Sequence, residues 1–372
     1  MKFGFTTGTC ATATSKAASY MLLTGKIKKS IKIKTPKGII FSAKIIDIKR
    51  SENKVSCAVI KDGGDDPDIT SGCHVVSSVS FLPQKNELAK PYVIIKGGKG
   101  VGKITKPGLD QKVGEAAINS VPRKMIEKEV LEVCALCDYK GGLEVEISVP
   151  EGINLAEKTF NPRLGILGGI SILGTSGIVE PMSSQALKDT IYIELKQQKF
   201  LGQKVASVSP GNYGLDFMKK SFNYNLDKSV KCSNFIGETI DMALDLGFKK
   251  FLLCGHIGKL IKISGGIMNT HSKEGDCRME LLTCAAIKSG CTLETAKKIL
   301  DSVSSEEGIS LIKNEGKLEE TMKYILDKIM FYLNKRANNK LEIACIIFCN
   351  QFGLLAKTQN ALTFLEEYKN KF

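Results

Sequence analysis

The sequence predicts an α+β domain in residues 1–180, followed by an α/β domain with a small parallel sheet in residues 181–372. In the first half, short β patterns dominate and only a few helices lie between them, which is typical of an α+β domain. In the second half, strand and helix patterns alternate, which favours a parallel sheet with right-handed crossovers. A glycine-rich segment, residues 163–181, lies at the boundary between the two halves.

The first half begins with a helix and continues with strands, each bounded by Gly, Pro, Asn or Asp. The two expected helices are CATATSKAASYMLL (residues 10–23) and RKMIEKEVLEVCAL (residues 123–136). The expected strands are IKIKTP (31–36), IIFSAKIIDIKR (39–50), KVSCAVIKDGG (54–64), HVVSSVSFLP (74–83), YVIIKGG (92–98) and GLEVEISVP (142–150).

The second half opens with the helical segment SSQALKDTIYIELKQQKF (183–200), which begins at serines suited to capping a helix. Apolar periodicity then predicts strands and helices in alternation. The strands are VASVS (205–209), KKFLLCG (249–255) and IACIIFCN (343–350), and the helices include NFIGETIDMALDLG (234–247) and LEETMKYILDKIMFYLNK (318–335).

Composition narrows the classes of protein to consider. Hydrophobic residues make up 43% and charged residues 25% of the chain, as in soluble globular proteins. No apolar run reaches the roughly 20 residues of a membrane-spanning helix, and the first residues lack the apolar core of a signal peptide. We therefore expect a cytoplasmic protein without membrane contact. Its twelve cysteines are then better explained as buried thiols or ligands than as disulfides.

The net charge of +14 comes almost entirely from scattered lysines. Proteins that bind nucleic acid rely on arginine and aromatic side chains, whereas this chain has five arginines and no tryptophan. We expect no nucleic-acid partner, and an RNA-binding module is retained only as an alternative that a steep salt dependence would reveal. The charge suits either a solvated lysine-rich surface or a small polyanionic substrate.

The segment GGKGVGKI (97–104) nearly matches the phosphate-binding loop GxxxxGK[ST]. Ile104 replaces the Ser or Thr that would hold magnesium, and Pro107 follows where a helix should begin. Without a helix N-terminus such a loop lacks aligned N–H donors for phosphate. One hypothesis is a nucleotide-dependent small-molecule kinase that uses Lys103. The other is a glycine turn that lets the backbone pass close to a ligand or to the other domain.

The segment GGDDPDIT (63–70) places Asp65, Asp66 and Asp68 around a proline turn. Neighbouring carboxylates can bind a cation or raise one another's pKa enough to act as a base. The alternative is a solvated Asx turn. The cysteine pairs 134/137 and 345/349 lack a second pair at metal-binding spacing, so we expect no protein-bound metal.

The segment CGHIGKLIKISGGIMNTHS (254–272) holds His256 and His271, two of the three histidines. A buried strand, FLLC, ends directly before Gly255, where an open parallel sheet presents ligand-binding loops. If the sheet is as predicted, SPGN (209–212) and CNQ (349–351) lie on the same edge. Three loops would then surround one cleft, with His256 as the better catalytic candidate; either histidine could instead be structural.

Seven motifs in order resemble one family, CbiD, the cobalt-precorrin-5B C1-methyltransferases of anaerobic cobalamin biosynthesis. The motifs are TTGTCATA (6–13), GGDDPDIT, GGKGVGKITKPGL, VPRKMI, NPRLGILGGISILGTSGIVEPMS, SVSPGNYG and CGHIGKLIKISGGIMNTHS. The resemblance covers residues 6 to about 280 and implies methyl transfer from S-adenosylmethionine to C-1 of a tetrapyrrole, giving cobalt-precorrin-6A. The substrate carries many carboxylates, which suits the lysine surplus. A homo-oligomer is compatible with the sequence.

The resemblance implies three sets of site residues. For catalysis we expect His256, Asp65 and Asp66. For S-adenosylmethionine we expect Gly168, Gly169, Thr175, Ser176, Gly177, Gly255 and Gly258. For the substrate we expect Thr6, Thr7, Thr9, Arg163, Lys259 and His271, with Arg163 and Lys259 holding carboxylates.

The glycine-rich segment has two interpretations. Its backbone could lie against the flat macrocycle or the adenosyl group while Ile and Leu supply apolar contact. It could instead be a domain hinge or a close strand crossing. Under the first interpretation, Val at Gly168 or Gly169 abolishes ligand binding in a folded protein. The GxGxG loop of the common S-adenosylmethionine fold is missing, so the donor must bind through a different loop arrangement.

Overall fold

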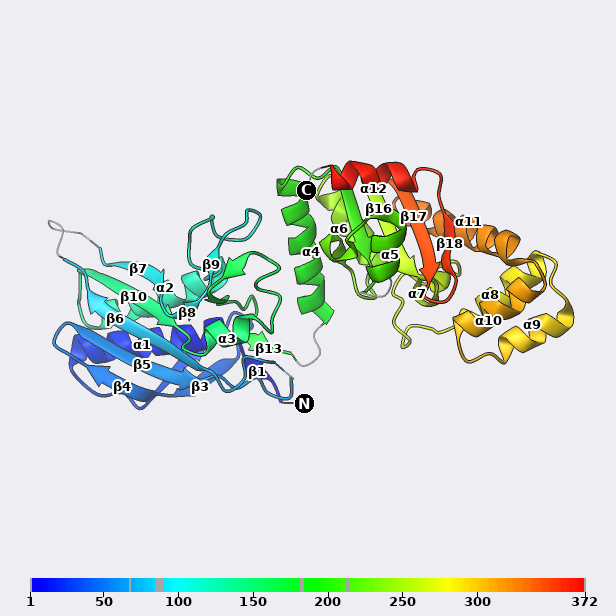
Figure 1. Ribbon diagram of the computed structural model, residues 1–372. Coiled ribbons are helices and arrows are strands. Elements are labelled where there is room, and N and C mark those ends of the chain that lie inside the picture. The colour runs from blue at the N-terminus through cyan, green and yellow to red at the C-terminus, as the bar shows by residue number, and fades with distance from the viewer. Residues whose placement is uncertain (1, 67, 84–89, 181–183, 212–214, 371–372) are drawn as a thin grey trace. The chain divides into compact units, whose positions relative to one another are not determined.

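In the computed structural model the chain folds into two compact units, Met1–Ser183 and Ser184–Phe372 (Figure 1). The structure describes residues 2–66, 68–83, 90–180, 184–211 and 215–370. The first unit combines a largely antiparallel sheet with helices, and the second contains a mostly parallel sheet. The predicted fold class is thereby confirmed.

The first unit is built on a five-stranded sheet. Its strands in spatial order are β4 (Ile46–Arg50), β5 (Lys54–Ile60), β6 (His74–Phe81), β10 (Gly142–Ser148) and β7 (Tyr92–Gly97). Only β10 and β7 run parallel to each other. Two helices, α1 (Thr7–Thr24) and α2 (Ser120–Leu136), pack against each other and share one apolar core with the sheet.

Helix α1 consists mainly of small residues, and this lets it lie close to the sheet. Thr6 caps its first turn by accepting a hydrogen bond from the N–H of Thr9, and Gly25 ends it in the left-handed conformation. Where α1 crosses β6, the hydroxyl of Ser77 lies 2.6 Å from that of Thr14 and 2.9 Å from that of Ser15. The buried polar groups at this crossing therefore satisfy one another.

The predicted strand 39–50 is wrong in one respect, because it is two strands. Strand β3 (Ile40–Lys44) pairs with β2 (Ser30–Lys34) in a separate hairpin, while β4 pairs with β5 in the main sheet. Ile45, between them, is buried in the core. The chain thus changes sheets at a residue that continues the apolar pattern, which explains why the break is invisible in the sequence.

The glycine-rich segment forms a series of two-residue strands. Each pairs with a short strand from earlier in the unit, and α3 (Gly152–Ala156) packs beside them. The pairs are β13 (Ile178–Val179) with β1 (Gly4–Phe5), β12 (Gly169–Ile170) with β8 (Gly100–Val101), and β11 (Ile166–Leu167) with β9 (Lys103–Ile104).

The second unit has a five-stranded sheet with helices on both faces (Figure 1). The strands in spatial order are β15 (Val230–Lys231), β14 (Val205–Ser209), β16 (Lys250–His256), β17 (Glu342–Cys349) and β18 (Gly353–Lys357). The first four are parallel, and the edge strand β18 is antiparallel to β17. The antiparallel edge strand was not predicted.

Alternate residues of β16 face two different cores. Phe251 and Leu253 belong to the larger core, and Leu252 and Cys254 to the smaller. The larger core includes residues of α4 (Ser184–Phe200), α6 (Ile236–Asp245), α7 (Ile257–Ile263) and α11 (Leu318–Arg336). The smaller core includes residues of α5 (Leu215–Phe222), the 3₁₀ helix η1 (Leu226–Lys228) and α12 (Ala361–Lys369).

Three further helices follow α7 and form a lobe: α8 (Arg278–Lys288), α9 (Leu293–Leu300) and α10 (Ser305–Asn314). All twelve cysteines are free thiols, and nine of them are buried. Burial raises the pKa of several of these thiols, that of Cys10 to about 12. Within the described residues, no helix is long and apolar enough to span a membrane.

Candidate active site

A cavity of about 370 Å³ lies at the carboxyl edge of the second sheet. Three loops at the ends of parallel strands line it: residues 209–211 at the end of β14, Asn350 after β17, and four residues at the end of β16, namely Gly255, His256, Gly258 and Lys259. Residues 304–306, at the start of α10, and Arg278 of α8 also line it. The expected cleft between three strand-end loops is therefore present. Asn212, the last residue of SPGN, lies outside the described residues.

His256 stands where β16 ends and α7 begins, and it serves as the N-cap of α7. Its Nδ1 accepts a hydrogen bond from the N–H of Gly258 at 3.1 Å, and its Nε2 lies 3.3 Å from Oε1 of Glu306. Because an N–H already points at Nδ1, the neutral ring carries its proton on Nε2 and directs it toward Glu306. Nδ1 can accept a proton from a ligand only when the contact with Gly258 opens.

Glu306 joins two of the loops around the cavity. Its Oε1 accepts a hydrogen bond from the N–H of Asn350 at 3.3 Å, in addition to the contact with His256. About a third of its side chain is exposed, at 34%. Glu306 was not predicted from the sequence, because a glutamate in the first turn of a helix is common for its favourable interaction with the helix dipole alone.

Lys259 lies in the first turn of α7 and is partly buried in the cavity wall. Its Nζ donates to the carbonyl oxygens of Pro210 at 3.0 Å and Ser233 at 3.4 Å. Burial lowers the pKa of Lys259, and the charge of Lys262 lowers it further. Among the described residues, no carboxylate forms an ion pair with Lys259, so its charge is available to an anionic group.

A second hollow of about 310 Å³ shares Gly258, Lys259 and Arg278 with the first. Here Arg278 donates from Nε and Nη2 to the two carboxylate oxygens of Asp276, at 2.6 and 3.0 Å. His271 is exposed at the rim, and its Nδ1 accepts a hydrogen bond from the N–H of Lys273 at 3.1 Å. The structure thus brings Gly258, Lys259 and His271, all predicted from the sequence, to adjoining hollows.

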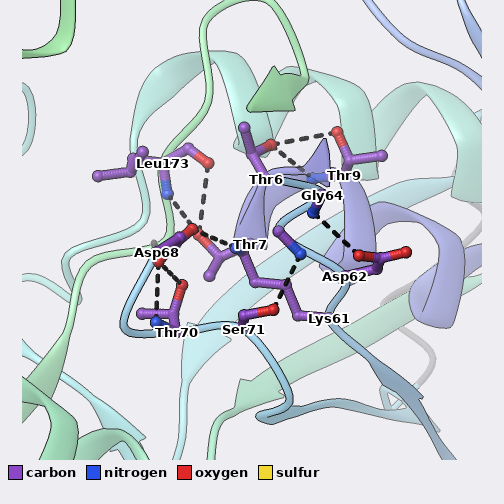
Figure 2. A network of polar contacts seen from close by, with 11 residues as sticks. Thr6, Thr7, Thr9, Lys61, Asp62, Gly64, Asp68, Thr70, Ser71 and Leu173 are labelled. Carbon is purple, nitrogen blue, oxygen red and sulfur yellow. Dashed lines mark hydrogen bonds and ion pairs between the residues drawn. The ribbon is translucent and has the colours of Figure 1, made fainter. Parts of the chain in front are cut away.

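In the first unit, the threonines of TTGTCATA hold the glycine-rich segment in place (Figure 2). Thr9 is fully buried and donates from Oγ1 to the carbonyl of Gly177 at 2.6 Å. Thr7 lies at hydrogen-bonding distance from both the N–H and the carbonyl of Leu173, 3.1 and 3.4 Å. Thr6 caps α1. All three side chains form hydrogen bonds inside the unit, which gives them a structural role, and their contact with substrate stays a prediction.

The glycines of this segment serve two different purposes. A Cβ at Gly169 would clash with the carbonyl group of Gly100, so β12 can pair with β8 only because residue 169 is glycine. At Gly174 a Cβ would clash with Thr6. Gly168, by contrast, has a φ of +78° and open space around its Cβ position. The expectation that Val at Gly169 leaves a folded protein is therefore corrected, while Gly168 stays a candidate for ligand contact.

The remaining predicted residues of the segment are Arg163, Thr175 and Ser176. Thr175 is exposed, and Arg163 and Ser176 are half-buried. The hydroxyl of Ser176 donates to the carbonyl of Ile178 at 3.2 Å. Leu167 and Leu173 are about half exposed, at 50% and 49%, while the isoleucines between them are buried. The segment therefore presents both leucine side chains to solvent.

The loop GGKGVGKI does not have the form of a phosphate site. The N–H of Gly102 donates to the carbonyl of Ile170 and that of Ile104 to the carbonyl of Glu115, at 2.9 and 3.0 Å. Strand β9 ends at Ile104, and the next helix, α2, begins only at Ser120. Both amides are already used and no helix follows, so this geometry favours the close backbone crossing over the nucleotide loop.

The acidic loop GGDDPDIT is held by internal contacts. Asp65 accepts a hydrogen bond from the N–H of Lys2 at 2.6 Å, and Asp68 forms an ion pair with the buried Lys61 (Figure 2). Asp68 also accepts from the N–H and hydroxyl of Thr70, at 2.8 and 2.6 Å. Asp66 is half-buried, and Pro67 lies outside the described residues. In the part of the chain that the structure describes, no cluster of His, Cys, Asp or Glu could hold a metal ion.

Ionisation of Asp68 follows from these contacts. Burial acts to raise the pKa of its carboxyl, but the charge of Lys61 and the hydrogen bonds from Thr70 outweigh it, so the pKa lies below its usual value. Asp68 is therefore suited to anchoring Lys61 and is a poor proton acceptor.

Comparison with known proteins gives the family. Residues 1–181 match the family model described as CbiD, and residues 269–359 match that of the CbiD C-terminal domain. A protein of Ruminiclostridium cellulolyticum named cobalt-precorrin-5B C(1)-methyltransferase is 47% identical over 94% of this chain and 89% of its own length. The chain belongs to the CbiD family.

Other members of the CbiD family also match the chain. A protein of Alkaliphilus metalliredigens with the same name is 42% identical over 100% of this chain and 96% of its own length. A crystal structure of the cobalamin biosynthesis protein cbiD from Archaeoglobus fulgidus is 25% identical, covers 73% of this chain and 83% of its own, and has a TM-score of 0.38. The family models and the two relatives confirm the resemblance found from the seven motifs.

Proposed function

We propose that this chain transfers the methyl group of S-adenosylmethionine to C-1 of cobalt-precorrin-5B and so forms cobalt-precorrin-6A in cobalamin biosynthesis. Two relatives that match nearly the whole chain carry the name of this methyltransferase. The observation that carries the proposal is the cavity at the carboxyl edge of the second sheet, where His256, Lys259 and Glu306 meet.

The residues around this cavity suit a charged co-substrate. Within the described residues, Lys259 forms no ion pair with a carboxylate. The buried hydroxyl of Ser305 likewise has no hydrogen-bond partner among them. Such groups are stabilised when a bound molecule supplies the missing partner. S-adenosylmethionine supplies a methyl group already activated by its sulfonium, so positioning of the partners and exclusion of water can provide most of the acceleration.

In this proposal different residues of the chain have different roles in binding and proton transfer. Lys259 and Arg278 hold anionic groups at the cavity, and His256 accepts a proton when its contact with Gly258 opens. Gly255 and Gly258 keep the strand end bare next to the ligand. In the first unit, Gly168 and Thr175 offer accessible backbone and hydroxyl groups. Leu167 and Leu173 offer apolar contact to a flat macrocycle.

The test is an anaerobic incubation of the protein with cobalt-precorrin-5B and methyl-labelled S-adenosylmethionine, followed by mass spectrometry of the tetrapyrrole. We expect one labelled methyl group on the macrocycle. Absence of label with a folded protein and a competent substrate would contradict the proposal. An ATP titration of the wild type and of Lys103→Ala runs in parallel, because ATP binding that depends on Lys103 would favour the kinase alternative.

A further inference from the structure

We infer that the cavity at the carboxyl edge of the second sheet recognises an α-amino acid zwitterion, with Glu306 facing its ammonium group and Lys259 facing its carboxylate. The inference rests on the proposed function, in which the zwitterion is the methionyl end of S-adenosylmethionine. It assigns that end of the methyl donor to the second unit and gives Glu306 a role in binding.

Opposite charges line this one cavity without neutralising each other. Lys259 comes from the first turn of α7 and Glu306 from the first turn of α10, and both line the cavity. Among the described residues, no ion pair joins the two, and the contacts of Lys259 are carbonyl oxygens. A cation and an anion held apart in one small cavity match a ligand that carries both charges a short distance apart.

Glu306 has capacity for a further donor. The two hydrogen bonds at its Oε1 are long, 3.3 Å each, and within the described part of the chain none reaches its Oε2. A carboxylate offers about four lone-pair sites. The ammonium of an amino acid, with three donors, is the complementary group. The carboxylate also weighs against a simple phosphate or sulfate in this cavity, since it would repel them.

The carboxylate end of the ligand has its own partners. Ser305, the first residue of α10, is 4% exposed, and its hydroxyl has no partner among the described residues. The N-terminus of α10 adds a partial positive charge at the same place. Gly258 keeps the space between His256 and Ser305 open, because a Cβ there would lie 3.2 Å from Nδ1 of His256 and 3.9 Å from Oγ of Ser305. A carboxylate beside Lys259 would therefore meet a cation, a hydroxyl and a helix N-terminus.

Binding of three analogues to the full-length protein, measured by isothermal titration calorimetry, tests the inference. S-adenosylhomocysteine carries the whole zwitterion, decarboxylated S-adenosylmethionine keeps only the ammonium, and 5′-methylthioadenosine lacks both. We expect Glu306→Gln to lower the affinity for S-adenosylhomocysteine about tenfold, or roughly 1.4 kcal/mol. The affinity for 5′-methylthioadenosine should not change. We expect Lys259→Gln to lower the affinity for S-adenosylhomocysteine by a similar factor and to leave the affinity for decarboxylated S-adenosylmethionine unchanged.

The neighbouring residue Glu307 provides a matched control. Glu307 lies in the same helical turn, but its carboxylate accepts from the N–H of Val303 at 2.9 Å. It is not among the residues that line the cavity. Glu307→Gln makes the same change of charge and can still accept that hydrogen bond, so we expect unchanged affinity for all three analogues. Thermal melting of each variant monitors folding.

The outcomes separate this inference from the proposed function. Suppose that the wild-type protein binds S-adenosylhomocysteine and labels the macrocycle, and that Glu306→Gln binds all three analogues with normal affinity. This result would overturn the inference but not the proposed function. Equal losses for S-adenosylhomocysteine and 5′-methylthioadenosine would also overturn it, because the effect would not depend on the zwitterion. Wild-type protein that binds no analogue and transfers no label would overturn the proposed function, and the inference with it.

Discussion

The glycine-rich segment of the first unit and the sheet edge of the second both contain glycines, hydroxyls and charged side chains, but they use them differently. In the first unit, Thr9 bonds to Gly177, Asp68 to Lys61, and Gly169 packs on Gly100. In the second unit, Lys259 faces a cavity without an ion-pair partner among the described residues, and the contacts of Glu306 with His256 and Asn350 use only its Oε1. Similar residue types thus maintain the fold in one region and remain available to a ligand in the other.

The comparison is tested most strongly at the buried ion pair. Asp68→Asn leaves the ammonium of Lys61, whose side chain is 1% exposed, without an ion-pair partner among the described residues. We expect the free energy of unfolding to fall by about 3 kcal/mol at pH 7. Urea denaturation of the wild type and the variant measures this loss. A change below about 0.5 kcal/mol would show that the acidic loop does not maintain the fold.

The stability difference between the wild type and the same variant should depend on pH. The pKa of Asp68 is lowered in the folded protein, so its carboxylate stabilises the fold above the unfolded pKa of about 3.9. That contribution is lost as the pH falls through the lower folded pKa. The stability difference between wild type and Asp68→Asn should therefore narrow below about pH 4. A difference that stays constant from pH 7 to pH 3 would contradict this assignment.

In the second unit, the comparison predicts loss of activity without loss of stability. His256→Asn removes the imidazole but keeps a side chain that caps α7 well. We expect turnover to fall about 100-fold, the lower range for loss of a general acid or base, while stability changes by less than about 1 kcal/mol. Single-turnover methyl transfer and thermal melting measure the two effects. Normal turnover would reduce His256 to a helix cap.

Two neighbouring glycines allow a matched test within the glycine-rich segment. Gly169→Ala places a Cβ against the carbonyl group of Gly100, so we expect a loss of about 2 kcal/mol in stability. Gly168→Ala meets open space, and its positive φ costs about 1 kcal/mol. Denaturation curves of both variants give the ranking. The reverse order would show that β12 and β8 do not pack as described.

The smallest expected effect comes from a single hydroxyl. Thr9→Val keeps the shape of the side chain but removes the hydrogen bond to Gly177, and we expect a loss of about 1 kcal/mol in stability. Thr9→Ser retains the hydroxyl and serves as the control. If Thr9→Val stays fully stable but loses affinity for the tetrapyrrole, Thr9 acts on the substrate and the comparison fails.

Elements with a clear apolar period could be predicted from the sequence. The helix expected at residues 318–335 is α11, Leu318–Arg336, and the strand expected at 205–209 is β14. The change of sheets at Ile45 could not be predicted, because that residue continues the apolar pattern on both sides. Strand β18 was missed because it is a short edge strand that follows β17 after a tight turn.

Residues of the candidate site could be predicted only where their position directly after a buried strand places them at the sheet edge. His256 and Lys259 follow a buried strand, and strand ends face a cleft in any open parallel sheet. For Thr7 and Thr9 the sequence could not show the hydrogen bonds inside the unit, because their partners Leu173 and Gly177 lie more than 160 residues away along the chain. Glu306 reaches the cavity from a separate lobe, and nothing local in the sequence marks that approach.

The distribution of thiols gives the protein a built-in labelling position. Nine cysteines are buried, whereas Cys277 and Cys284 are exposed, and Cys277 directly precedes Arg278 in the wall of both hollows. Alkylating reagents act on accessible thiolates, so a maleimide dye should modify these two positions in the native state. Cys137 is half-buried, so in a variant with Cys137 and Cys284 replaced by serine a single fluorophore at Cys277 would report occupancy of the cavity directly, without turnover and without the oxygen-sensitive tetrapyrrole.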